Sequence, residues 1–174
     1  MAENIEKVTL NLICVDACDH SKRAMDWYLS TLHREGDDVG LVHVHCLPEL
    51  PSFGLYEMFD YKPYNAESSF IAGGLLATDL YQEQIKESIQ ASKKIVEQYK
   101  KFLAEKEITA KIYCRSMIDS VGHTICEIAK ESNATTIIMG QRGLGVIRRT
   151  FLGSTSDYVL HHAHIPVAVI PPNQ

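Results

Sequence analysis

Short apolar runs alternate regularly with longer amphipathic segments along this chain. The runs are rich in Val, Ile and Leu, and each is followed within two residues by a glycine, a proline or a polar residue. Runs of this kind are typical of strands that are buried on both faces of a sheet. The five runs are residues 7–15, 39–46, 110–115, 134–139 and 167–170.

The segments between the runs carry apolar residues three or four positions apart, which predicts helices with one buried face. We expect helices over 21–32, 80–107, 121–129 and 153–163. Asp19 or Ser21 is expected to cap the first of them, and Asp119 or Ser120 the third, because these residue types accept hydrogen bonds from the free N–H groups of a helix start.

This alternation predicts a five-stranded parallel sheet with helices on both faces, because each connection between parallel strands must cross one face. Right-handed crossovers make it a doubly wound α/β fold, Rossmann-like or flavodoxin-like. The second and third strands then lie on one side of the first, and the fourth and fifth on the other, in the order 3-2-1-4-5. We expect one domain over residues 1–174, with an elaborated loop at 48–78, which is rich in Pro, Gly and aromatic residues.

The charge balance argues against several classes of partner. The chain has 17 Lys and Arg against 22 Asp and Glu, a net charge of -5, so it lacks the basic field that binds nucleic acids or anionic membranes. The first residues are acidic and polar, and no uncharged apolar run approaches the roughly 20 residues that span a bilayer. Five cysteines without C-x-x-C spacing favour reduced thiols. We therefore expect a cytoplasmic protein that binds neither nucleic acid nor membrane.

Two features follow predicted strands at the edge where open α/β sheets bind ligands. Asp16 follows the first strand, and a glycine-rich stretch over 140–155 follows the fourth. Glycines allow a backbone to approach a phosphate, and a helix that starts at Gly153 offers free N–H groups, a positive dipole end and two hydroxyl groups. Arg142 adds positive charge beside them. The stretch therefore predicts a phosphate-binding site.

The glycine spacing distinguishes this stretch from common nucleotide motifs. No Lys-Ser/Thr follows a G-x-x-x-x-G, and Gly143-Leu-Gly145 lacks the third glycine of the dinucleotide fingerprint. The spacing from Gly140 to Ser154 is instead G-2x-G-9x-G-S. It resembles the ATP-binding members of the universal stress protein family, and the resemblance extends over nearly the whole chain.

The resemblance implies that the chain binds an adenine nucleotide, ATP or AMP, with Mg²⁺ accompanying ATP. Carried over residue by residue, it implies that Val15, Asp16 and Val44 contact adenine or ribose. Asp16 is also the candidate ligand for Mg²⁺. The remaining contacts that the resemblance implies are Met139, Gly140 and Gly143 along the nucleotide, and Gly153, Ser154 and Thr155 on the phosphates.

Three functions are open at this point: a nucleotide-binding module in stress response or signalling, a slow Mg-dependent ATP hydrolase, and a structural dimer module without nucleotide. An efficient hydrolase needs a residue that orients water and a cation on the transferred phosphoryl group. Asp16 has no evident partner for that task, so we expect at most slow hydrolysis and assign no catalytic residue. A flavin carrier is disfavoured, because the phosphate loop follows the fourth strand and not the first.

The last strand carries the expectation for assembly. In the order 3-2-1-4-5, residues 167–170 form an edge strand, and they are apolar and uncharged. An uncovered edge of this kind readily pairs with another strand. We expect a homodimer joined through Val167 and Val169 of two copies around a two-fold axis.

Two groups of histidines invite a metal interpretation. His43 and His45 lie two residues apart in a predicted strand and have no third candidate ligand. His161, His162 and His164 lack the i, i+4 spacing of a helical zinc pair. We interpret both groups as structural, with the second group bonding carbonyl groups at a helix end.

Overall fold

The computed structural model describes residues 9–48, 66–141 and 152–172. The elements in chain order are β1 (Leu10–Cys14), α1 (Asp19–Trp27), the π-helical turn η1 (Tyr28–Leu32), β2 (Asp38–His45), α3 (Ala66–Ala104), β3 (Ala110–Ser116), α4 (Val121–Glu131), β4 (Thr136–Gly140), α5 (Ser154–His162) and β5 (Val167–Ile170). The strand order is β3-β2-β1-β4-β5, and every neighbouring pair is parallel. The predicted doubly wound α/β fold and its order are confirmed.

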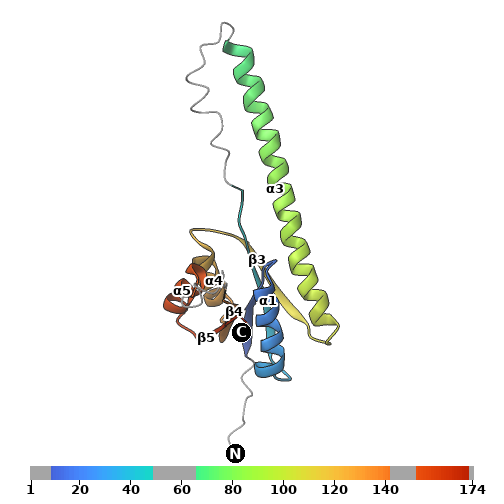
Figure 1. Ribbon diagram of the computed structural model, residues 1–174, viewed down its shortest axis with the longest axis vertical. Coiled ribbons are helices and arrows are strands. Elements are labelled where there is room, and N and C mark those ends of the chain that lie inside the picture. Colours follow the sequence, from blue (N-terminus) through green and yellow to red (C-terminus); the bar gives the residue numbers. More distant parts are fainter. Residues whose placement is uncertain (1–8, 49–65, 142–151, 173–174) are drawn as a thin grey trace, which may run out of the picture.

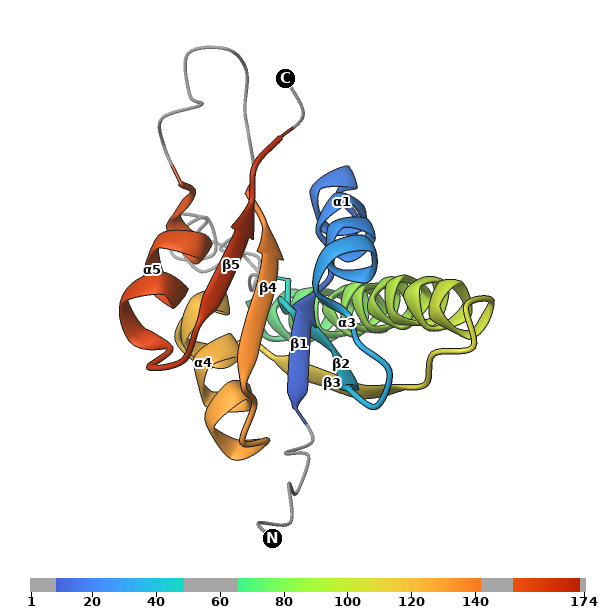
Figure 2. The same cartoon turned by 90° about the horizontal axis from the view of Figure 1, so that it is seen from below.

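Helices cover both faces of the sheet, with α1 and α3 on one face and α4 and α5 on the other (Figure 2). The central strand β1 packs against the helices on both faces of the sheet. Leu12 is fully buried with side chains of α4 and α5, and Ile13 is fully buried with side chains of α1 and α3. Because successive side chains point to opposite faces, a central strand needs apolar residues at every position.

The helix α3 has 39 residues and begins earlier than the sequence pattern predicts. Its C-terminal part packs on the sheet through Tyr99 and Leu103, and Figure 1 shows its N-terminal part extending beyond the sheet. Residues 66–78 are therefore helical, so the loop predicted over 48–78 was wrong for this part, while 49–65 lie outside the described residues. The pair Gly73-Gly74 costs about 1 kcal/mol per glycine relative to alanine, and the neighbouring Ala and Leu residues sustain the helix.

The predicted helix caps are confirmed for one helix and wrong for another. Ser120 caps α4, and its side-chain oxygen accepts a backbone N–H of the first turn at 3.1 Å. The helix α1 instead follows Cys18, which provides no side-chain cap, so neither Asp19 nor Ser21 has this role. The Asp16 carboxylate, at the end of β1, instead accepts the Cys18 N–H at 2.9 Å and the Ser21 hydroxyl at 2.5 Å.

Within the described ranges, no helix is both long enough and apolar enough to cross a membrane. The long helix α3 has charged side chains on its exposed face, among them Lys86, Glu87 and Lys93.

Candidate functional site

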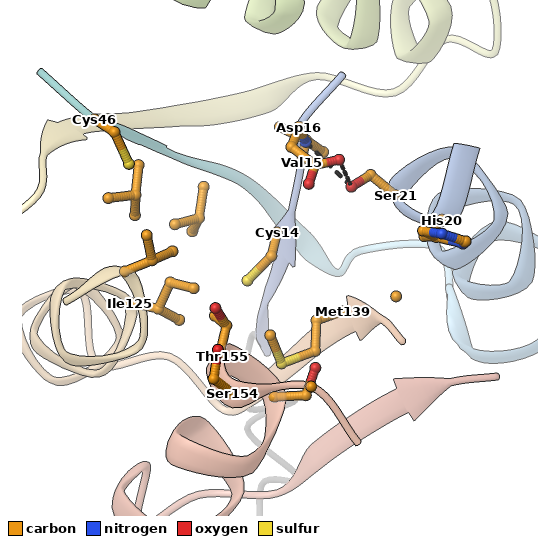
Figure 3. Close-up of a pocket in the computed structure, with 16 residues that line it drawn as sticks. Cys14, Val15, Asp16, His20, Ser21, Cys46, Ile125, Met139, Ser154 and Thr155 are labelled. Atoms are coloured by element: carbon orange, nitrogen blue, oxygen red, sulfur yellow. Dashed lines mark hydrogen bonds between the residues drawn. The ribbon is translucent and has the colours of Figure 1, made fainter. Parts of the chain in front are cut away.

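A cavity of about 540 Å³ lies at the carboxyl ends of β1, β2 and β4, beside the first turns of α1, α4 and α5 (Figure 3). The strand order changes direction here, because the chain adds β2 on one side of β1 and β4 on the other. This is the place where open α/β sheets bind their ligands.

The cavity brings together eight of the ten residues predicted to contact a nucleotide. These eight are Val15, Asp16, Val44, Met139, Gly140, Gly153, Ser154 and Thr155. The other two, Arg142 and Gly143, lie outside the described residues. The positions are distant in sequence and meet because the carboxyl ends of parallel strands share one edge of the sheet. Their role in binding stays a prediction.

The lining has an apolar and a polar part. In the view of Figure 3, Cys46 and Ile125 lie at one end of the group, and Asp16, Ser21 and His20 lie at the other. The apolar part is completed by valines of β2 and of the first turn of α4. Ser154 and Thr155, at the start of α5, add two hydroxyl groups beside Ile125. The cavity thus combines apolar surface with a few polar groups, as sites for small ligands commonly do.

The first strand ends in a hydrogen-bonded turn around Asp16. Its Oδ1 accepts the Cys18 N–H at 2.9 Å and the Ser21 hydroxyl at 2.5 Å, and the Ser21 hydroxyl oxygen accepts the Asp16 N–H at 3.1 Å. Behind this turn, the Nδ1 of buried His43 donates to the Val15 carbonyl at 2.8 Å. Asp16 therefore stabilises a turn, as aspartate often does. The hydrogen bonds of this turn hold its carboxylate at the wall of the cavity.

The start of α5 presents N–H groups that the helix itself cannot use. The Gly153 backbone has φ 79° and ψ 141°, a conformation that is open essentially to glycine alone. The Gly153 carbonyl accepts the first intrahelical bond from the Asp157 N–H at 2.9 Å. The N–H groups of Ser154, Thr155 and Ser156 precede that bond, so they have no acceptor within the helix.

Eight lining residues were not among the predicted contacts: Cys14, His20, Ser21, Val42, Cys46, Val121, Ile125 and Ser156. A usable signal existed for several of them. Val42 and Cys46 stand two positions on either side of Val44, so the period of a strand places them on the same face. Val121 and Ile125 stand one helical turn apart at the start of α4.

The thiol of Cys14 forms part of the cavity wall. Burial raises its pKa to about 12, and the nearby Cys126 and Asp16 add to this effect. Cys14 is therefore a neutral thiol at physiological pH and behaves as a small apolar side chain.

The histidines that invited a metal interpretation have structural partners. His45 Nδ1 lies 3.2 Å from the Ser92 hydroxyl of α3. At the end of α5, the Nδ1 atoms of His161 and His162 lie 2.8 and 2.7 Å from carbonyl oxygens one turn earlier in the helix. In the part of the chain that the structure describes, no three His, Cys, Asp or Glu side chains are grouped so as to hold a metal ion.

Residues 11–171 match the model of the Universal stress protein family. Universal stress protein PHOS34 of Arabidopsis thaliana is 28% identical over 163 residues, which are 91% of this chain and 60% of that protein. Universal stress protein YxiE of Bacillus subtilis is 23% identical over 161 residues, 91% of this chain and 96% of that protein. Universal stress protein Slr1101 of Synechocystis is 42% identical over 55 residues, 32% of this chain and 51% of that protein. The chain thus spans about half the length of Slr1101.

Solved structures show the same fold. The universal stress protein UspA from Lactobacillus plantarum superposes with a TM-score of 0.60 at 22% identity, covering 94% of this chain and 98% of that one. A universal stress protein family protein from Arabidopsis thaliana, solved with AMP bound, has a TM-score of 0.59 at 17% identity, with 95% and 92% covered. With the family match extending over residues 11–171, the chain belongs to the universal stress protein family.

Proposed function

We propose that this protein binds an adenine nucleotide, ATP or AMP, in the cavity at the carboxyl ends of β1, β2 and β4, and acts as a stress-response or signalling module. The observation that carries the proposal is the meeting of an apolar wall with the free N–H groups of a helix start in one cavity of about 540 Å³. The structure of the Arabidopsis relative with AMP bound supports it.

In this proposal each part of the cavity takes one part of the nucleotide. The apolar side chains of Val44, Val121 and Ile125 pack on the adenine ring. The N–H groups and hydroxyls of Ser154 and Thr155 bind phosphate oxygens, where the positive end of the α5 dipole favours negative charge.

We propose binding without efficient turnover. Asp16 is the one carboxylate among the described residues that line the cavity, and its Oδ1 already holds the start of α1. A fast hydrolase needs a group that is available to orient the attacking water. Mg²⁺ would be coordinated mainly by the phosphate oxygens of ATP, and Asp16 is the carboxylate of the described lining that could coordinate it as well.

We also propose that the protein is a cytoplasmic homodimer joined through β5. The five cysteines are free thiols, which fits a reducing compartment. The strand β5 pairs only with β4 within the described sheet and forms one of its edges.

The direct test is to release the ligand with acid from freshly purified protein, to identify it by chromatography and mass spectrometry, and to titrate the stripped protein with ATP, AMP and adenosine by calorimetry. We expect an adenine nucleotide in the released fraction and saturable binding of ATP or AMP. A stripped protein that binds none of the three compounds would overturn the proposal.

A matched pair of glycine variants tests where the nucleotide binds. Gly153 and Gly36 both have positive φ, 79° and 91°, and a Cβ on either would meet no atom within 4 Å. Gly153→Val and Gly36→Val therefore both place a β-branched residue at positive φ without a steric clash, but only the first lies in the cavity. We expect Gly153→Val to lose ATP binding and Gly36→Val to keep it. Equal affinities for the two variants would contradict the placement of the phosphates.

A further inference from the structure

His20 lines the cavity, and Arg23, three residues further along α1 and outside the cavity lining, forms a pair with it. The Arg23 Nη2 lies 3.1 Å from the His20 Nδ1, and it also donates to the Gln141 carbonyl at 3.4 Å. His20 lines the cavity (Figure 3), and Gly140 at the end of β4 also belongs to the lining. The pair therefore connects the first turn of α1 to the end of β4, where the glycine motif begins.

The hydrogen bond between the two side chains determines which ring nitrogen of His20 can donate. A guanidinium group has only donors, so Nδ1 must be the acceptor. The proton of the neutral ring is thereby assigned to Nε2. In the described part of the chain Nε2 makes no hydrogen bond, and His20 thus offers an N–H donor of fixed tautomer at the cavity.

Among the residues that the structure describes, no carboxylate forms an ion pair with Arg23, although Asp19 and Asp26 share its helix. Its Nε is buried and has no hydrogen-bond partner. A buried donor without a partner destabilises a fold and is rare in proteins, so the position of Arg23 needs an explanation.

We propose that His20 contacts a phosphate of the bound nucleotide through its Nε2–H, and that Arg23 is a positioning residue that orients the imidazole and supplies positive charge behind it. The inference rests on the proposed function, because it assigns a further contact in the same site. Charge-assisted hydrogen bonds of this type discriminate a nucleotide from its nucleoside, since adenosine has no group for His20 to bind.

The test is calorimetric titration of the full chain with AMP and adenosine, for the parent and for four variants. His20→Ala should weaken AMP binding roughly tenfold or more and leave adenosine within about twofold. His20→Gln, whose amide nitrogen can take the place of Nε2, should recover most of the AMP affinity. Arg23→Ala should weaken AMP binding in the same selective way, whereas Lys22→Ala, which removes an exposed charge from the same helix, should not.

A spectroscopic readout separates positioning from a merely structural role of Arg23. The ¹⁵N shifts of the His20 ring should indicate a single tautomer with the proton on Nε2 in the parent, and a mixture of tautomers in Arg23→Ala. A parent protein that binds AMP while His20→Ala keeps the same ratio of AMP to adenosine affinity would overturn this inference alone. An equal loss in Lys22→Ala would overturn it as well. A parent that binds no nucleotide would overturn the proposed function together with it.

Discussion

The backbone of Gly140 lies against the backbone of His20, so that a Cβ built on Gly140 would fall 2.3 Å from the His20 carbonyl oxygen. The sequence pattern predicts Gly140 as a place where a nucleotide approaches the chain. The structure adds a second reason for glycine at this position, because α1 can start directly against the end of β4 only if residue 140 has no side chain.

Gly140→Ala should therefore destabilise the fold and disturb the cavity at once. A backbone carbonyl cannot move aside as a side chain can, so we expect a loss of about 2–3 kcal/mol in the free energy of unfolding, measured in urea. Gly40→Ala is the matched control. A Cβ there meets side-chain atoms of Leu12 and Tyr113 and no backbone atom, so we expect a smaller loss than for Gly140→Ala. A Gly140→Ala protein as stable as the parent would show that α1 can move away from β4.

The sheet was predictable because central parallel strands must be apolar at every position. The last strand was predicted over 167–170, and β5 is Val167–Ile170. The first was predicted over 7–15, and the described strand is the shorter Leu10–Cys14. The length of α3 was underestimated for a physical reason. Helix propensity accounts for the local cost of Gly73-Gly74. It does not account for cooperativity, by which a helix that continues to Ala104 can include two unfavourable residues.

The site was predictable where it is built from strand ends and glycines, as for Asp16, Met139 and Gly153. These positions follow from chain direction alone, since all carboxyl ends of a parallel sheet lie at one edge. His20 and Ile125 were missed because they lie on helices. Which residues of a helix face a cavity depends on the rotation of the helix about its own axis when it packs on the sheet. This rotation cannot be predicted from a single sequence.

Asp16 can be tested with two substitutions that separate its turn from its charge. Asp16→Asn keeps an oxygen that can accept from Cys18 and Ser21, whereas Asp16→Ala removes it. We expect Asp16→Ala to weaken binding of both Mg-ATP and adenosine, because the wall of the cavity loosens. Asp16→Asn should weaken Mg-ATP more than adenosine. Calorimetry with and without Mg²⁺ measures both, and affinities unchanged in Asp16→Ala would leave Asp16 as a turn residue only.

The cysteines report on the cavity through their alkylation rates. Cys46 and Cys114 are both exposed, but only Cys46 lines the cavity. We expect bound ATP to slow the reaction of Cys46 with iodoacetamide and to leave Cys114 unchanged, as measured by peptide mass spectrometry. Cys14 should stay unmodified at pH 8 in the folded protein, because a pKa of about 12 leaves almost no thiolate. Equal protection of Cys46 and Cys114 would point to a general change in the protein and not to the cavity.

Buried tyrosines make the fold sensitive to alkaline pH. Burial raises the pKa of Tyr28 and of Tyr99 to about 12. The unfolded chain releases these protons near pH 10, so stability is unaffected by them below pH 10 and falls between pH 10 and 12. Urea unfolding across this range should show the fall, and Tyr28→Phe should reduce it.

The same substitution has a cost at neutral pH. Tyr28 is fully buried, and its hydroxyl accepts the Asn11 side-chain N–H at 3.3 Å. Tyr28→Phe leaves that amide buried without its partner, so we expect a loss of about 1–3 kcal/mol at pH 7. If the free energy of unfolding falls equally steeply between pH 10 and 12 in parent and variant, groups other than Tyr28 cause the fall.

The edge strand β5 carries the prediction for assembly. The opposite edge, β3, has Lys111 and Arg115, and charged side chains of this kind oppose strand pairing. The strand β5 has no charge. The carbonyl groups of Pro166 and Ile170 accept bonds from Ile137 of β4 and from Gln141, the residue after β4. Because successive residues of a strand bond to opposite sides, the backbone groups of Val167 and Val169 point away from the sheet.

A second copy can use these outward groups in an antiparallel pair around a two-fold axis, which closes the assembly at two subunits. We expect the parent to be a dimer by light scattering at about tens of micromolar, a range in which dimers of low-micromolar affinity assemble. Val167→Lys places a charge at the edge, although Val167, like Val169, also packs against the core. Val169→Pro provides the second variant, because it removes one outward N–H and leaves the bonds to β4 in place. Both variants should become monomers with the circular dichroism of the parent, and a monomeric parent or two dimeric variants would rule out pairing through β5.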